Sequence, residues 1–221
     1  MDAPGQFCVD CFRNTGFISA PFCGRCGVPL AHANQATRGV CPRCAAHPPA
    51  WTRARAALRY DAQSKRLILP FKHADRIDLA GPLAAMMLRA GAELIKDAEL
   101  IVPVPLHPAR LRARRYNQAV LLGRQIQNRT GLRLLPDALV RLQATAPLGE
   151  LGASERASLL AGKFAPRLGA REQFEGRHVL LVDDVLTSGA TATECSLVLL
   201  AAGATAVDVL VVARVPDPRL G

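Results

Sequence analysis

The sequence predicts an α/β protein in which a parallel sheet is flanked by helices and preceded by a small cysteine-rich domain. Beyond residue 50, apolar runs alternate with helical patterns, and this alternation is typical of a parallel sheet wrapped by helices. Before residue 50, six of the seven cysteines form three Cys-x-x-Cys pairs. Residues 45–50, Ala-Ala-His-Pro-Pro-Ala, are typical of a linker. We therefore expect two domains, 1–50 and 51–221.

The cysteine pairs predict a structural metal site. In a reducing compartment this pattern indicates metal binding rather than disulfides, because each pair places two thiolates on one side of a tight turn. Two such turns complete a tetrahedral zinc site with no open position. Three pairs cannot make two four-sulfur sites, so one pair is left over.

We assign the zinc site to the second and third pairs. They are separated by 14 residues, close to the usual spacing of a zinc ribbon, and Gly24 and Gly27 permit a sharp turn at the second pair. The predicted zinc ligands are Cys23, Cys26, Cys41 and Cys44.

Two alternatives for the cysteines remain open. The first pair, Cys8 and Cys11, could instead combine with Cys23 and Cys26, across 11 residues. The thiols could also carry no metal. The seventh cysteine, Cys195, lies in an apolar helical pattern, which favours a small core residue over a nucleophile.

Hydrophobic periodicity predicts the elements that follow the linker. Residues 62–73 and 79–96 have amphipathic helical patterns, the second with Pro82 in its first turn. Residues 99–106 form an apolar run that contains two prolines, which predicts a strand ending in a rigid loop. Residues 115–130 have helical periodicity and stop at a glycine, a C-cap signal.

The rest of the chain completes the alternation of strands and helices. Residues 144–165 are polar and weakly patterned, which is typical of a mobile loop with one short helix near 155–160. A buried strand is predicted over 178–182, a helix over 190–202 and a strand over 206–213.

The charge predicts an anionic partner. The formal net charge is +10, and the stretch between Glu99 and Asp137 contains no carboxylate but seven arginines. These are Arg110, Arg112, Arg114, Arg115, Arg124, Arg129 and Arg133. The planar guanidinium group matches phosphate better than the ammonium of lysine does. A general preference for arginine in the composition would give the same count without a ligand.

Composition and hydropathy exclude other classes of protein. A hydrophobic content of 50% argues against a disordered chain. The most apolar run, 197–212, is broken by Gly203 and Asp208, so we expect no membrane span. The first six residues lack the basic and apolar regions of a signal peptide. We therefore expect a cytoplasmic protein.

The chemistry is concentrated in residues 179–191, Val-Leu-Leu-Val-Asp-Asp-Val-Leu-Thr-Ser-Gly-Ala-Thr. An apolar strand ends in Asp183 and Asp184, and a Thr-Ser-Gly turn opens the next helix. In an open parallel sheet, ligands bind outside the carboxyl ends of the strands. Backbone N–H groups, two hydroxyls and a helix N-terminus suit a phosphate, whereas two carboxylates suit sugar hydroxyls or a divalent cation. The segment therefore predicts a site for a phosphorylated ribose.

This segment resembles the phosphoribosyl pyrophosphate signature of the type I phosphoribosyltransferases. That signature is a hydrophobic strand, two acidic residues and Thr-Thr/Ser-Gly-x-Thr. The resemblance implies that Asp183 and Asp184 are the catalytic pair and hold the ribose 2- and 3-hydroxyls, and that Mg²⁺ binds together with phosphoribosyl pyrophosphate. The implied cradle for the 5-phosphate consists of Thr187, Ser188, Gly189, Ala190 and Thr191.

With the cysteine pairs in front, the whole chain resembles the ComF family of competence-related proteins, in which a zinc ribbon precedes a phosphoribosyltransferase-like domain. Further matches are residues 102–107, Arg114 with 116–118, and 69–72. The resemblance implies that the loop after the first core strand binds pyrophosphate. The residues implied are His107, Arg114, Asn117 and Gln118. Without a ligand, the arginines of this stretch would form a solvated surface.

The sequence departs from the family pattern at several positions. Arg115 stands where members usually have glycine, which puts the backbone geometry of the loop in doubt. Between residues 145 and 164, members usually carry a Gln and then an adjacent Arg and Asn, where we find Leu148, Ser158 and Leu159. These losses weaken the case for turnover more than the case for binding.

Two functions are consistent with these observations. The first is an enzyme that displaces pyrophosphate from phosphoribosyl pyrophosphate, with Mg²⁺ and arginines stabilising the leaving group. The second is a ribose-phosphate sensor that binds single-stranded DNA or a competence protein through the ribbon and the basic stretch. Aromatic residues make up only 5%, which argues against an extensive base-stacking surface. The acceptor and the oligomeric state do not follow from the sequence.

Overall fold

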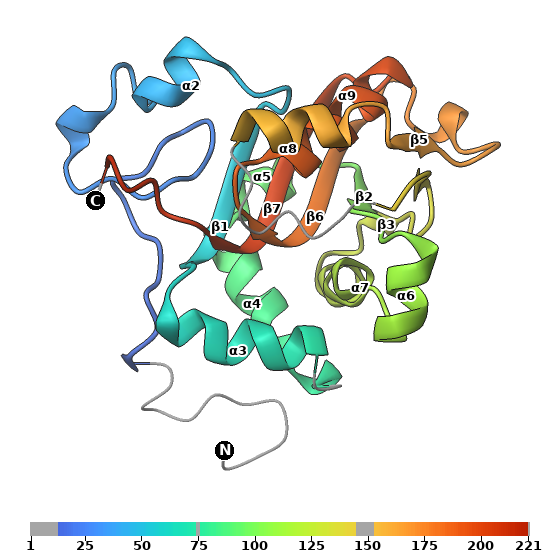
Figure 1. The fold of residues 1–221 in the computed structure, drawn as a ribbon, viewed down its shortest axis with the longest axis horizontal. Helices are drawn as coiled ribbons and strands as arrows, with labels where there is room; N and C mark the ends of the chain where they lie inside the picture. Colours follow the sequence, from blue (N-terminus) through green and yellow to red (C-terminus); the bar gives the residue numbers. More distant parts are fainter. Residues whose placement is uncertain (1–12, 74–75, 145–152, 221) are drawn as a thin grey trace.

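The structure, a computed structural model, describes residues 13–73, 76–144 and 153–220 (Figure 1). Its centre is a parallel sheet of five strands in the order β1-β7-β6-β2-β3. The strands are β1 (Arg53–Arg59), β2 (Leu100–Pro103), β3 (Arg133–Leu134), β6 (His178–Leu186) and β7 (Ala206–Arg214). The predicted α/β class with a parallel sheet is confirmed.

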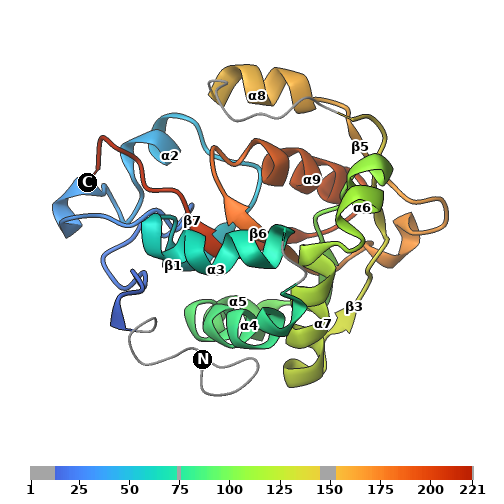
Figure 2. The ribbon, with the colours of Figure 1, turned by 60° about the horizontal axis from the view of Figure 1, so that its bottom comes forward.

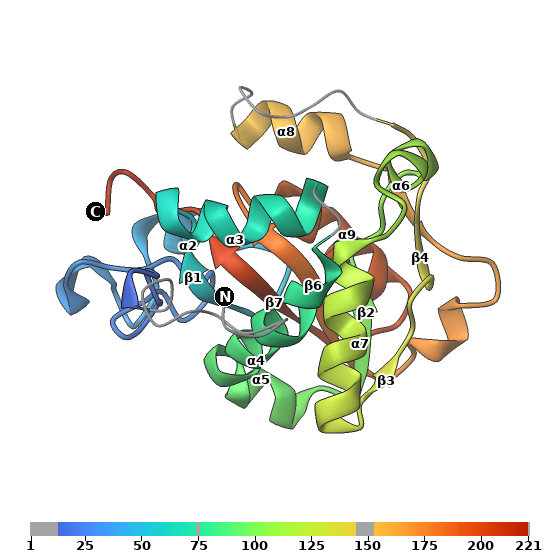
Figure 3. The same ribbon diagram turned by 90° about the horizontal axis from the view of Figure 1, so that it is seen from below.

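Helices cover both faces of the sheet (Figure 2). One face packs against α3 (Ala62–His73), α4 (Ala80–Ala90), α5 (Ala92–Asp97) and α7 (Gln118–Thr130), and α7 also contacts the β2–β3 edge (Figure 3). The other face packs against α9 (Ala190–Ala201), with α8 (Ala153–Leu160) beside α9. The short elements include α6 (Pro108–Arg114), the antiparallel pair β4 (Leu139–Arg141) and β5 (Phe164–Pro166), and the 3-10 turns η1 (Ala33–Gln35), η2 (Ile77–Leu79) and η3 (Arg171–Gln173).

Most predicted helices and strands are present near their predicted bounds, and one helix is divided. The helix predicted over 79–96 is two helices, which meet at Gly91. A Cβ atom on Gly91 would lie 2.6 Å from a side-chain carbon of Leu210 on β7. The glycine therefore allows the backbone to approach the sheet at the point where the helix breaks. The short helix expected near 155–160 is α8, while residues 145–152 of the expected mobile loop lie outside the described residues.

Strand β6 is longer than predicted. We expected it to end before the two carboxylates, but its pairing with β7 continues through Asp183 opposite Val211 to Leu186 opposite Arg214. Asp183 and Asp184 are therefore residues of the strand itself. Their backbone is held by the hydrogen bonds of the sheet and does not belong to a loop.

Strand β1 was not predicted, because its sequence Arg-Ala-Arg-Ala-Ala-Leu-Arg contains no β-branched residue. A buried carboxylate fixes its register. The backbone N–H of Arg53 donates to Asp208 Oδ1 over 3.0 Å, and the Arg53 guanidinium also pairs with this carboxylate. Asp208 has no exposed surface and its other side-chain partner is His178, at 3.0 Å.

The N-terminal ribbon packs directly on the sheet domain (Figure 1). Its described part, residues 13–50, contains η1 and α2 (Pro42–Ala46). The four buried cysteines belong to the same hydrophobic cluster as Trp51, Ala54 and residues of β6 and β7. The boundary near residue 50 stays a sequence prediction, but the two parts share one core.

In the described parts of the chain, none of the helices has both the length and the apolar character needed to cross a membrane.

Candidate functional site

The four predicted zinc ligands come together in the ribbon. Their sulfur atoms all lie within 4.8 Å of one another, all four residues are buried, and Cys26 Sγ is 3.8 Å from Cys41 Sγ. A tetrahedral site with Zn–S bonds of about 2.3 Å requires sulfur–sulfur distances of about 3.8 Å. Backbone N–H groups of Cys26 and Cys41 donate to Cys23 Sγ, over 3.5 and 3.3 Å. The donor set therefore fits a closed structural Zn²⁺ site.

The thiols also perturb one another electrostatically. Hydrogen bonds from the Cys26 and Cys44 side chains lower the pKa of Cys23 well below its ordinary value. The same contact with Cys23 raises the pKa of Cys26 to about 11, and contact with Cys23 and Cys26 raises the pKa of Cys44. Without a cation, these buried sulfurs cannot all be thiolates; a divalent ion would supply the missing positive charge.

Cys8 and Cys11, and with them the alternative pairing of the first Cys-x-x-Cys pair, lie outside the described residues. Cys195 is completely buried, and burial raises the pKa of its thiol well above its ordinary value. It is a core residue, as the apolar helical pattern predicted.

The two carboxylates of β6 have different surroundings. Asp183 is half-buried, and desolvation together with repulsion from Asp184 raises its pKa to about 7. Asp184 is buried, with 8% of its surface exposed, and its Oδ1 forms an ion pair with Lys72 Nζ on α3 at 2.9 Å. The site therefore contains one carboxylate that is neutralised by a lysine and one that is partly protonated near neutral pH.

Residues 187–191, which we call the phosphate loop, consist of the turn 187–189 after β6 and the first two residues of α9. Thr187 is exposed, and Gly189 has a φ of +88° at the N-cap position of α9. A Cβ atom at Gly189 would also lie 2.6 Å from a ring carbon of Trp51. Glycine is therefore required here both for its backbone conformation and for a close approach. The 12-residue helix α9 directs its N-terminus at this loop, which favours an anion.

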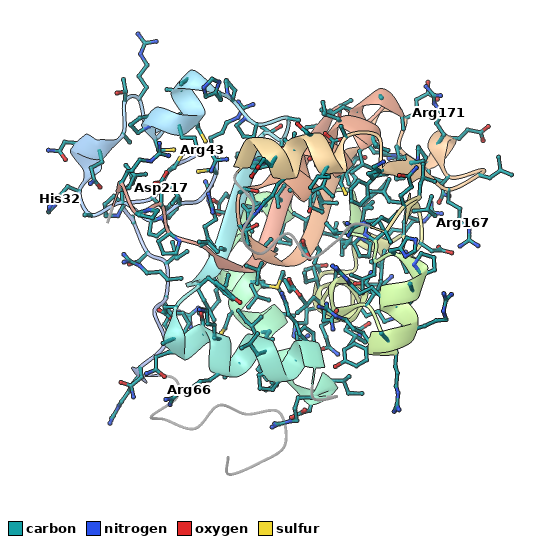
Figure 4. All side chains as sticks on the ribbon, in the orientation of Figure 1. His32, Arg43, Arg66, Arg167, Arg171 and Asp217 are labelled. Atoms are coloured by element: carbon teal, nitrogen blue, oxygen red, sulfur yellow. The ribbon has the colours of Figure 1, made fainter. Side chains whose placement is uncertain are left out.

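Cavities lie on two sides of the phosphate loop. A small cavity of about 60 Å³ is bounded by Asp183, Arg156 and residues 187–192. A larger cavity of about 390 Å³ is bounded by Thr187, Ser188 and the C-terminal residues 215–219, with guanidinium groups from the ribbon, α8, β7 and the C-terminal segment. Those groups belong to Arg43, Arg156, Arg214 and Arg219. Figure 4 shows Arg43 and Asp217 on the side of the molecule where the ribbon lies.

The predicted pyrophosphate segment is partly helical, whereas we expected a loop. His107 is the N-cap of α6, and its Nδ1 accepts from the N–H of Ala109 over 3.2 Å. Asn117 is the N-cap of α7, and its side-chain amide donates to the carbonyl of Val104 over 3.0 Å. These two side chains therefore shape the backbone of the segment.

Gln118 and Arg114 are linked to the acidic pair through Lys72. Gln118 is 2% exposed, and its Nε2 donates to the carbonyl of Lys72 over 3.2 Å, while Arg114 Nη1 donates to Gln118 Oε1 over 3.3 Å. Arg114 and Lys72 both act to lower the pKa of Asp183. The segment thus reaches the carboxylates through Lys72.

The departures from the family pattern have visible effects. Arg115 ends α6 with a φ of +65°, the left-handed region that favours glycine. Ser158 and Leu159 are exposed on α8, and Leu148 lies outside the described residues. On the same helix, Arg156 Nη1 is 3.4 Å from the Thr187 hydroxyl, so α8 still brings one cation to the phosphate loop.

Sequence reasoning assigned no role to five site residues: Lys72, Arg156, Arg43, Trp51 and Arg214. Lys72 is the last residue of 69–72, a segment that matches the family pattern. A lysine three residues after the apolar turn 67–69 could have suggested a site residue. The others have no local signal, because their partners are distant in the chain; Arg214 is 188 positions from Cys26, whose carbonyl it contacts.

The fold and site define an α/β protein in which a ribbon with four clustered cysteines precedes a sheet whose strand β6 carries two acids and leads through a turn into α9. Residues 1–45 match the family described as "Double zinc ribbon domain". The chain is 31% identical over 212 residues to the DNA utilization protein YhgH of Escherichia coli K12, covering 94% of this chain and 89% of that protein. It is 31% identical over 217 residues to competence protein F of Haemophilus influenzae, covering 96% and 92%. The chain belongs to the family of these two proteins, the ComF family.

The chain also shows a limited similarity to solved structures of enzymes. One is the allosteric regulatory enzyme of purine biosynthesis, with a TM-score of 0.41, 21% identity, and coverage of 65% of this chain and 30% of that chain. Another is a hypoxanthine phosphoribosyltransferase from Staphylococcus aureus, with a TM-score of 0.41, 15% identity, and coverage of 64% and 66%. The family membership of the chain rests on its sequence relatives.

Proposed function

We propose that this protein binds phosphoribosyl pyrophosphate at the carboxyl end of β6. The observation that carries the proposal is the juxtaposition of two carboxylates and the phosphate loop on one strand–turn–helix segment. Asp183 and Asp184 would accept hydrogen bonds from the ribose 2- and 3-hydroxyls, and residues 187–191 would donate N–H and O–H groups to the 5-phosphate.

The pyrophosphate would lie toward α6 and α7. Arg114 and Lys72 supply positive charge close to Asp183 and Asp184, and Arg156 supplies it close to Thr187. Mg²⁺, held by the ligand's pyrophosphate and the carboxylates, would neutralise the charge of the leaving group. His107, Asn117 and Gln118 would position this segment rather than contact the ligand through free side chains.

Calorimetric titration of phosphoribosyl pyrophosphate with Mg²⁺ tests the proposal. We expect the wild type to bind and the double variant Asp183→Asn/Asp184→Asn to show no heat of binding. The variant Asp137→Asn, a matched exposed position on the chain, is expected to bind like the wild type. If the wild type shows no binding, the proposal is wrong. If the wild type does bind, detection of released pyrophosphate with candidate acceptors decides between transfer and binding alone.

A second function, binding of single-stranded DNA, is supported by the names of the relatives and by exposed arginines. The relatives are a DNA utilization protein and a competence protein. Arg112, Arg115, Arg124, Arg129 and Arg133 are exposed in or beside α6 and α7. We expect sequence-tolerant binding that weakens steeply with salt, because phosphate contacts release counterions. Fluorescence anisotropy of a labelled oligonucleotide measures this, and affinity indifferent to salt would contradict it.

The cytoplasm is the compartment that suits this function. Reduced thiols are needed to hold Zn²⁺, and the cytoplasm keeps thiols reduced. Localisation of a tagged full-length chain tests this part of the proposal.

A further inference from the structure

The zinc ribbon is linked to the phosphate loop by one direct contact and by two indirect ones through Arg214 and Trp51, and each involves a residue in one of the Cys-x-x-Cys turns. Arg43, between Cys41 and Cys44, donates through Nη2 to the carbonyl of Ser188 over 2.8 Å. The carbonyl of Cys26 accepts from Arg214 Nε over 3.3 Å. The remaining contact runs through the carbonyl of Arg25, between Cys23 and Cys26, which accepts from Trp51 Nε1 over 3.2 Å.

Arg214 reaches both partners at once. This residue ends β7, is 5% exposed, and donates through Nη1 to the carbonyl of Thr187 over 2.6 Å. The same nitrogen contacts the carbonyls of Leu186 and Val215, over 3.1 and 2.8 Å. Because the guanidinium is planar and rigid, the position of Cys26 and the position of Thr187 are fixed relative to each other.

Trp51 makes the third connection by packing. Its indole lies so close to Gly189 that a Cβ there would be 2.6 Å from the ring. A cavity of about 170 Å³ between ribbon and loop is lined by Cys26, Cys44, Ser188 and Gly189, among others. Two of the zinc-site cysteines and two residues of the phosphate loop therefore line the same cavity.

These contacts orient the loop's donors. In a planar trans peptide the carbonyl and the following N–H point in opposite directions. Arg214 holds the Thr187 carbonyl and Arg43 holds the Ser188 carbonyl, so the N–H groups of Ser188 and Gly189 point away from these arginines. Those two N–H groups belong to the loop that would receive the 5-phosphate.

We propose that Arg214 is a positioning residue that couples the zinc ribbon to the phosphate loop, so that zinc loading sets the affinity of the loop for a phosphate ester. This inference rests on the proposed function for the identity of the ligand. The ribbon then acts as a support for the ligand site, in addition to any role as a contact surface.

The test uses the full-length chain and three variants: Arg214→Met, Arg214→Lys and the exposed control Arg66→Met on α3. Nitrogen-15 NMR of Gly189 is the readout that needs no ligand, because a nearby indole ring shifts its resonance. Trp51 is the single tryptophan, so its emission reports on the same contact. Zinc content is measured for each protein, and phosphoribosyl pyrophosphate with Mg²⁺ is titrated into each.

We expect Arg214→Met to retain one zinc per chain, to shift the Gly189 resonance and to bind phosphoribosyl pyrophosphate at least tenfold more weakly. Zinc removal from the wild type should shift the same resonance and the Trp51 emission, and Arg214→Lys should recover part of the affinity. The Arg66→Met control should match the wild type in all respects. A Gly189 resonance that stays unchanged in zinc-loaded Arg214→Met overturns the coupling. If instead Gly189 responds but the zinc-loaded wild type binds no ligand, the coupling stands and the proposed function falls.

Discussion

Replacing Asp183 by asparagine is expected to stabilise the fold at pH 8 and to remove ligand binding. The pKa of Asp183 is raised to about 7 by desolvation and by Asp184, whereas an unfolded aspartate titrates near pH 4. Between these values the folded chain binds more protons than the unfolded chain, so this carboxyl makes stability fall as pH rises from about 4 to about 7. Above that window its cost is constant.

The size of the effect follows from the shift. Three units at about 1.36 kcal/mol each give an upper bound of about 4 kcal/mol for the cost of ionising Asp183 in the folded state. Asp183 is only half-buried, so solvent screens part of this cost, and the asparagine amide must itself find hydrogen-bond partners. We therefore expect Asp183→Asn to be more stable by about 1–2 kcal/mol at pH 8.

Urea unfolding of both proteins at pH 5.5 and pH 8, followed by circular dichroism, measures this difference. Zinc binding changes with pH in both proteins, so its contribution largely cancels in the comparison. The matched variant Asp184→Asn should instead lose stability, because it removes the ion pair with Lys72. A stability difference between Asp183→Asn and the wild type that does not grow from pH 5.5 to pH 8 would refute the reasoning.

Three further substitutions have defined outcomes. Gly189→Ala places a Cβ atom at a φ of +88° and against the Trp51 ring. Calorimetry should show at least a tenfold loss of phosphoribosyl pyrophosphate affinity, with the zinc content unchanged. Unchanged affinity would contradict the loop geometry. Arg115→Gly removes the strain of a side chain in the left-handed conformation. Urea unfolding should show a gain of about 0.5–1 kcal/mol in the free energy of unfolding. A loss would mean that the Arg115 side chain stabilises the turn. Lys72→Met leaves the buried Asp184 carboxylate without its cation, and the free energy of unfolding should fall by about 1–3 kcal/mol. Adding Asp184→Asn to the same chain should restore most of this loss. If the second substitution restores nothing, Lys72 does not act through Asp184.

Local patterns predicted the parts of the fold that depend on local interactions. Helix α3 has the predicted bounds 62–73, because amphipathic periodicity alone defines it. Helix α7 ends before Gly131, whose φ of +75° is the C-cap geometry expected from its sequence position. The four-cysteine cluster likewise follows from spacing, since two tight turns need only be brought face to face.

The parts that sequence reasoning missed depend on contacts between distant segments. Strand β1 is stabilised by pairing with β7 and by the carboxylate of Asp208, not by its own alanines and arginines. Helix α6 begins at the Pro108 that follows an N-cap histidine, within a stretch interpreted as a binding loop. The attachment of the ribbon to the phosphate loop through Arg214 and Trp51 joins the two ends of the chain, and no local pattern encodes it.

A crystal structure of the zinc-loaded chain with phosphoribosyl pyrophosphate and Mg²⁺ tests the central claim most directly. The account predicts the 5-phosphate within hydrogen-bond distance of the N–H groups of residues 188–191 and the ribose hydroxyls on Asp183 and Asp184. Ligand density at any other place on the molecule, with the phosphate loop empty at saturating ligand, would contradict it.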